Sequence, residues 1–135
     1  MVERDEELEE ILSRVAKRMA RRLAKREDVV VVRSLDELHK LVRSNDVVVL
    51  LITTPICPAC RIYKPVFFEV ARKLGGKAVF VHLNAYDAPE VADTLEVYAV
   101  PTTVIFKDGR VFNKILGIVS PEDLEEAVME ALDSG

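Results

Sequence analysis

The sequence has no tryptophan, no glutamine and only two cysteines among its 135 residues. The cysteines, Cys57 and Cys60, are too few to build the disulfide framework that stabilises small secreted proteins. A bond between them would close a loop of about one helical turn, and so short a loop constrains the unfolded chain very little. The scarcity of cysteine therefore argues against a stabilising role for this pair.

Long hydrophobic stretches are also missing. The longest uninterrupted apolar run is Val47 to Ile52, far short of the ~20 residues that a membrane-spanning helix needs. The first residues are mostly acidic, without the positive start and apolar stretch of a signal peptide. We therefore expect a cytoplasmic protein that does not associate with a membrane.

An excess of positive charge is absent as well. The net charge of −4 argues against nucleic acid as the main partner. Hydrophobic residues make up 50% of the chain and charged residues 31%, which is typical of one soluble, globular domain. Asparagine occurs only at Asn45, Asn84 and Asn113. Together with the lack of glutamine and the many charges, this composition indicates a thermophilic protein, the alternative being chance in a short chain.

The periodicity of apolar residues predicts an α/β fold with a mixed central sheet of about five strands flanked by helices. Alternation of strands and helices requires parallel strands, and Asp108-Gly109 predicts an antiparallel hairpin at the end. An extra N-terminal helix precedes this pattern, so we expect an extension over residues 1–27 and a domain over residues 28–135. The predicted strands are 29–32, 47–53, 78–84, 102–107 and 110–116, and the predicted helices are 3–26, 34–44, 57–75, 89–95 and 120–135.

The two cysteines lie where a strand passes into a helix. Pro58 suits the first helical position, where its missing N–H costs nothing, and this places Cys57 at or near the N-cap. Unpaired N–H groups and the positive end of the helix dipole stabilise a thiolate there, and the thiolate is the species that attacks disulfides. Cys60, one turn further on, is placed to resolve a mixed disulfide. The pattern predicts a redox-active pair.

Two roles without redox chemistry are also open to the cysteines. A zinc site normally needs four ligands, and the chain offers only these cysteines with His39, expected on the surface, and His82. Two chains that pool their ligands could hold a metal ion or an iron–sulfur cluster, which would make the protein a binding module. The cysteines could also be inert thiols.

The order of these features resembles that of the thioredoxin superfamily over residues 28–134. The run Cys57-Pro58-Ala59-Cys60 stands at the position of the family's active-site pair, and Pro65 matches the proline that kinks the active-site helix. Pro101, after Val100, matches the family's cis-proline, which makes a cis Val100–Pro101 bond a prediction. Phe106-Lys107-Asp108-Gly109 resembles the family's hairpin, and Gly117 the glycine after the last strand.

The resemblance implies a thioredoxin-like fold and a thiol–disulfide oxidoreductase that acts on protein disulfides as a reductant. It makes Cys57 the attacking thiolate and Cys60 the buried resolving thiol, with Pro101, Val100 and Ile56 docking an extended substrate segment. It implies no metal and no cofactor. The expected partners are protein disulfide substrates and an electron donor such as a thioredoxin-reductase-like protein.

The chain departs from that family at three positions near the site. Ile56 replaces a tryptophan, and the dipeptide between the cysteines is Pro-Ala rather than Gly-Pro. Leu51 replaces the buried acid that helps the resolving cysteine lose its proton. His82 aligns with a lysine near that acid and could carry this proton. The favoured alternative for His82 is a strand-end residue that points to solvent or donates to a carbonyl.

The apolar stripe of the N-terminal helix needs a partner. We expect it to pack against its own domain. The second possibility is a homodimer, because an acidic half followed by a basic half is complementary to itself in the antiparallel direction. The third is a membrane surface or acidic partner bound by the basic half, which the acidic half opposes. The stripe consists of Leu8, Ile11, Leu12, Val15, Met19 and Leu23.

Overall fold

The computed structural model describes residues 2–26 and 28–135, with side chains described over 6–18 and 28–135. All ten predicted elements are present, and none of their ends differs from the expected one by more than two residues. The strands are β1 (Val29–Val32), β2 (Val47–Thr53), β3 (Val79–Asn84), β4 (Thr102–Lys107) and β5 (Arg110–Leu116). The helices are α1 (Val2–Arg26), α2 (Leu35–Ser44), α3 (Pro58–Leu74), α4 (Pro89–Thr94) and α5 (Pro121–Asp133).

The strands form one mixed sheet in the order β1-β3-β2-β4-β5. β1 and β2 both run parallel to β3, whereas β4 runs antiparallel to β2 and β5 antiparallel to β4. The apolar run of β2 is buried along its whole length, because this strand lies in the middle of the sheet with helices on both faces. The expected α/β fold with a mixed five-stranded sheet is confirmed.

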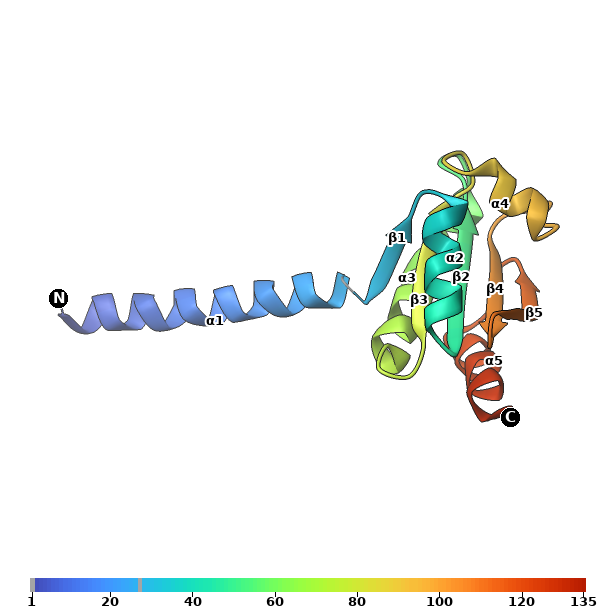
Figure 1. The fold of residues 1–135 in the computed structure, drawn as a ribbon. Coiled ribbons are helices and arrows are strands. Elements are labelled where there is room, and N and C mark those ends of the chain that lie inside the picture. The colour runs from blue at the N-terminus through green and yellow to red at the C-terminus, as the bar shows by residue number, and fades with distance from the viewer. Residues whose placement is uncertain (1, 27) are drawn as a thin grey trace.

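Alternate residues of each strand face opposite helical layers. On one face, α3 and α5 cover strand residues such as Val49, Leu51 and Ile105. On the other face, α2 and α4 cover Leu50 and Val104 among others. Burial of these two apolar layers is the main term that stabilises the domain. The arrangement of the helices around the sheet is seen in Figure 1.

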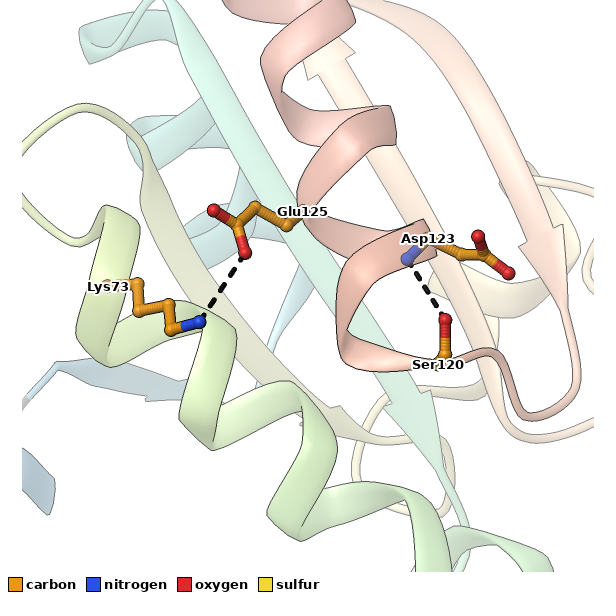
Figure 2. Close-up of polar contacts among 4 residues, drawn as sticks. All are labelled: Lys73, Ser120, Asp123 and Glu125. Carbon is orange, nitrogen blue, oxygen red and sulfur yellow. Dashed lines mark hydrogen bonds and ion pairs between the residues drawn. The ribbon is translucent and has the colours of Figure 1, made fainter.

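Local signals fix the ends of the elements. The hydroxyl of Ser120 accepts a hydrogen bond of 3.1 Å from the N–H of Asp123 and so caps α5. Nearby, Lys73 of α3 and Glu125 of α5 form an exposed ion pair of 3.7 Å (Figure 2). Asp108 and Gly109 both have positive φ angles, 51° and 82°, as the two-residue turn of a tight hairpin requires.

Helix α1 extends away from the sheet and its covering helices (Figure 1). Its apolar side chains at Leu8, Ile11, Leu12 and Val15 are all exposed. The expectation that this stripe packs against its own domain is therefore wrong for these four residues, whereas the side chains of Met19 and Leu23 lie outside the described part. No helix within the described residues is long and apolar enough to cross a membrane.

Candidate functional site

Cys57 is the N-cap of α3, as the position of Pro58 predicts. Its Sγ accepts a hydrogen bond of 3.1 Å from the backbone N–H of Cys60. This N–H is one of the groups in the first turn that have no partner within the helix. Because that N–H and the positive end of the helix dipole both point at Sγ, they favour negative charge on the Cys57 sulfur.

Cys60 faces inward from the next turn of the helix. Only 1% of its surface is exposed, compared with 8% for Cys57. The two residues form a disulfide, with their Cα atoms 5.2 Å apart. The more accessible sulfur therefore belongs to the residue that caps the helix, and the buried sulfur lies within bonding distance of it.

The segment before β4 lies beside Cys57. The Val100–Pro101 peptide bond is cis, which confirms that prediction. The carbonyl oxygen of Val100 lies 3.7 Å from the Sγ of Cys57, although 43 residues separate them in sequence. The carbonyl of Pro101 accepts a hydrogen bond of 2.8 Å from the N–H of Gly117, which ties this segment to the end of β5.

The other motif residues surround the pair on α3 and in the loop before it. Ile56 is 76% exposed and so presents an apolar surface directly beside Cys57. Pro58 is exposed and Ala59 half-buried in the first turn, and Pro65 is exposed within the same helix. A proline there leaves the carbonyl four residues earlier without its usual N–H partner, which permits a bend.

Leu51 lies at the centre of a row of three residues that crosses the sheet. Thr103 of β4 is its register partner on one side, and His82 of β3 is its register partner on the other. All three belong to the face of the sheet that α3 covers, and Leu51 is fully buried. Polar side chains therefore flank the apolar one that occupies the centre of the row.

Thr103 lies near Tyr63 of α3, a residue that the sequence analysis did not identify as part of the site. Tyr63 of α3, one turn beyond Cys60, is fully buried. Burial raises its pKa above the ordinary value of 10.0, and the nearby Thr103 hydroxyl partly offsets this rise. Neither hydroxyl makes a hydrogen bond of ordinary geometry. A tyrosine at helical spacing from Cys60 is typical of a core residue, so only the fold shows that two buried hydroxyls meet here.

His82 occupies the other end of the row and is half-buried. Its Nε2 lies 2.8 Å from the hydroxyl oxygen of Thr53, so its partner is a side chain rather than solvent or a carbonyl. The expected carbonyl or solvent contact is corrected by this pairing. Burial lowers the pKa of His82 from 6.5 to about 4, and the positive charge of Lys64 contributes to the same shift. The imidazole is therefore neutral at neutral pH.

The remaining histidine, His39, is exposed on α2, as expected. Across the part of the chain that the structure describes, no three histidine, cysteine, aspartate or glutamate side chains gather closely enough to hold a metal ion. The two cysteine sulfurs are instead bonded to each other. The arrangement is that of a dithiol–disulfide couple.

Comparisons with known proteins agree with this geometry. The Thioredoxin family model matches residues 29–130. A thioredoxin from Coprinus comatus is 29% identical over 77% of this chain and 98% of its own length. Thioredoxin H4 from Arabidopsis thaliana is 33% identical over 70% of this chain and 78% of its own length. The oxidised form of mitochondrial thioredoxin 3 from Saccharomyces cerevisiae superposes with a TM-score of 0.71 at 26% identity, covering 78% of this chain and 98% of that one.

Proposed function

This chain belongs to the thioredoxin family and is a thiol–disulfide oxidoreductase, and on that premise we propose a separate role for each residue of its site. Cys57 is the attacking thiolate, because it caps α3 and receives the N–H of Cys60. Cys60 is the resolving thiol, because its sulfur is buried and within bonding reach of Cys57. The position of Cys57 at the N-terminus of α3 is the observation that carries this proposal.

The proposed reaction exchanges one disulfide for another. The Cys57 thiolate attacks one sulfur of a substrate disulfide, the substrate S–S bond breaks, and its second sulfur leaves as a thiolate that takes up a proton. The Cys60 thiol then loses its proton and attacks the Sγ of Cys57, which releases the other substrate thiol. Two electrons pass to the substrate, and the chain is left with the Cys57–Cys60 disulfide.

We propose that Pro101, Val100 and Ile56 dock the substrate. The Val100 carbonyl lies 3.7 Å from the Cys57 sulfur, and Ile56 exposes an apolar side chain at the position just before Cys57 in sequence. An extended segment that carries the disulfide can bond to the backbone before Pro101 in the manner of an added strand. Pro58, Ala59 and Pro65 support the site by setting the start and the course of α3.

We assign His82 a positioning role through its contact with Thr53 rather than the role of proton carrier. A proton carrier needs a pKa near the working pH. Burial and Lys64 hold the pKa of His82 near 4, well below that range. The contact with Thr53 joins the ends of β2 and β3, immediately before the loop that leads to Cys57.

We further propose that the chain works as a reductant in the cytoplasm of a thermophile. The electron donor would be a reductase that itself reduces a disulfide, and the substrates would be protein disulfides. The absence of glutamine and the scarcity of asparagine support the thermophilic origin. A thermal unfolding midpoint well above the ~45–65 °C of mesophilic domains is expected. Residues 28–135 form the redox domain in this proposal, and residues 1–27 are an extension that takes no part in the chemistry.

Turnover of a model protein disulfide, with dithiothreitol as electron donor, tests the function. The wild-type chain should catalyse the reduction, and Cys57→Ser should abolish it. Ser44→Cys does not replace the lost thiol, because Ser44 precedes the start of β2 whereas Cys57 follows the end of that strand. Cys57→Ser combined with Ser44→Cys should therefore stay inactive. Activity in either variant would contradict the role given to Cys57.

A redox titration against glutathione tests the direction of the reaction. A potential well below that of the glutathione pool is expected for a reductant. A potential near that of an oxidase or isomerase would contradict the proposed direction while leaving the exchange chemistry intact.

A further inference from the structure

Helix α1 carries an apolar face that nothing in the described chain covers. Leu8, Ile11 and Leu12 are 55%, 54% and 58% exposed, and Val15 is 45% exposed. These four residues fall at three- and four-residue spacing, so they share one side of the helix. An amphipathic helix in water derives most of its stability from packing that face against something else. We therefore expect this face to pack against a partner outside the chain's own domain.

The charges of α1 are divided along its length. Residues 3–10 carry six acidic side chains and one basic one, whereas residues 14–26 carry seven basic side chains and no acidic one. Where side chains are described, over residues 6–18, every one is exposed. Two such helices repel each other when parallel, because like halves lie together. In the antiparallel direction each acidic half lies along a basic half.

We propose that α1 pairs with α1 of a second copy of this chain in an antiparallel two-helix interface. With Val2 of one helix level with Lys25 of the other, Leu12 of one copy lies level with Val15 of the other, and Leu8 lies level with Met19. A two-fold axis between the helices repeats both matches. The apolar positions 8, 12, 15 and 19 follow the alternating spacing of four and three that a coiled-coil seam requires.

The same overlap also matches opposite charges and brings no two like charges to the same level. Four acidic residues lie level with four basic ones, and Arg14 lies level with Ser13. Helix α1 has 25 residues, which gives a pair about 37 Å long at the usual rise per residue. The level pairs closer to the apolar face are Asp5 with Arg22 and Glu9 with Arg18, whereas Glu6 with Arg21 and Glu10 with Lys17 lie farther round each helix.

The fold leaves the redox site accessible in such a dimer. The helix ends at Arg26, shortly before β1 begins at Val29, whereas Cys57 comes after the last residue of β2. Because β1 and β2 both run parallel to β3, the start of β1 and the end of β2 lie at opposite ends of the strands. The proposed interface is therefore independent of the disulfide chemistry, and each can be tested without the other.

The first test is the solution mass of the full-length chain, measured by light scattering over a range of protein concentrations. The wild type should have twice the mass of the 15.2 kDa chain. Leu8→Ala combined with Leu12→Ala should shift the mass toward that of the monomer, since alanine keeps the helix but removes apolar surface. Ser13→Ala, on the other side of the helix from the apolar face, is the control and should remain dimeric. A monomeric wild type at every concentration would overturn the proposal.

The second test exchanges charge. One variant replaces Glu6, Glu9 and Glu10 with lysine, and the other replaces Arg14, Lys17 and Arg18 with glutamate. Each variant alone should be monomeric at low salt, whereas an equimolar mixture should form a heterodimer. If either variant dimerises alone as well as the wild type does, charge complementarity does not hold the helices together and the antiparallel pairing is wrong.

Two further measurements separate this partner from others. Zero-length carbodiimide cross-linking should join a carboxylate of residues 3–10 of one copy to Lys17 or Lys25 of the other. A dimer that gives no such cross-link between copies would contradict the antiparallel pairing. Sedimentation with anionic phospholipid vesicles should leave the chain in the supernatant. Vesicle binding by a monomeric chain would show that α1 serves a membrane surface instead.

Discussion

The hydroxyl oxygen of Thr53 lies 2.8 Å from Nε2 of His82, joining the last residue of β2 to the neighbouring strand β3. Both residues lie under α3, on the same face of the sheet as Leu51. In this position the imidazole is partly buried, and burial disfavours its protonated form. Electrostatic repulsion from the positive charge of Lys64 disfavours that form as well. Burial and Lys64 therefore set the protonation state of His82, and the contact with Thr53 fixes its position.

The lowered pKa of His82 makes the stability of the domain depend on pH. The pKa of His82 is about 4 in the folded chain and 6.5 in its ordinary state. Above pH 6.5 both folded and unfolded chains hold a neutral ring, and its contribution is complete. As the pH falls from 6.5 toward 4, the unfolded chain takes up a proton that the folded chain does not, so stability is lost. Urea unfolding should show a shallower decline across this range for His82→Gln than for the wild type.

The control for that measurement is His39→Gln. His39 is the chain's other histidine and is exposed on α2. This variant should follow the wild-type curve between pH 6.5 and 4. Equal slopes for wild type and His82→Gln would show that the folded chain does not hold His82 neutral.

The catalytic pH profile is expected to be insensitive to His82. With a pKa of about 4, the residue does not change charge near neutral pH, so it cannot supply a titrating step there. His82→Gln should keep the wild-type shape of the curve of kcat/KM against pH between about pH 6 and 9 for reduction of a protein disulfide. Loss of one limb of that curve would establish His82 as the proton carrier for Cys60.

Tyr63 and Thr103 place two buried hydroxyls together without a well-formed hydrogen bond. A buried polar group that lacks a partner costs about 1–3 kcal/mol. Tyr63→Phe removes one such group and keeps the ring, so the free energy of unfolding should stay the same or rise by about 1 kcal/mol. Tyr98→Phe, at a residue that is 87% exposed, is the control and should change nothing. A clear loss of stability in Tyr63→Phe would mean that its hydroxyl is satisfied.

Leu51 stands where the family resemblance implies a buried acid, and apolar side chains of the core surround it. It is fully buried between Thr103 and His82 in the register of the sheet. Leu51→Asp should lower the free energy of unfolding by more than about 2 kcal/mol, because truncating a buried leucine alone costs about 2–5 kcal/mol. Because burial raises the pKa of a carboxyl group, the loss should be greater at pH 8 than at pH 5.

Leu51→Asn separates charge from size in that experiment. The amide has nearly the shape of the carboxylate but does not titrate in this range. Its destabilisation should be equal at both pH values. If Leu51→Asp shows no additional loss at pH 8, water or a cationic partner reaches the side chain and this position is not a dry core site.

Cys60→Ser should trap the intermediate of the exchange. Cys57 keeps its place at the N-terminus of α3 and its N–H donor, so the first attack proceeds. Without a second sulfur the mixed disulfide is not resolved, and the covalent complex with substrate should accumulate and be detected by mass spectrometry. Cys57→Ser treated in the same way should give no complex. Complex formation through Cys60 alone would reverse the two roles.

The sequence by itself determined the elements, their order and the residues that react. Apolar periodicity separated the strands from the helices, and the helix start at Pro58 located Cys57 as its N-cap, because these signals depend only on neighbours along the chain. The hairpin at Asp108-Gly109 was equally local. The cis bond before Pro101 followed from the family resemblance, which ties a motif to a known fold.

Only the tertiary structure decided which groups meet across the sheet. The pairs Thr53–His82 and Tyr63–Thr103 join residues far apart in sequence, and their register depends on how β2, β3 and β4 align. The exposure of α1 was also undetermined, since an apolar stripe shows that a helix has a partner but not where that partner lies. Burial and register are properties of the packed chain, and they set the pKa of His82 and left the face of α1 open.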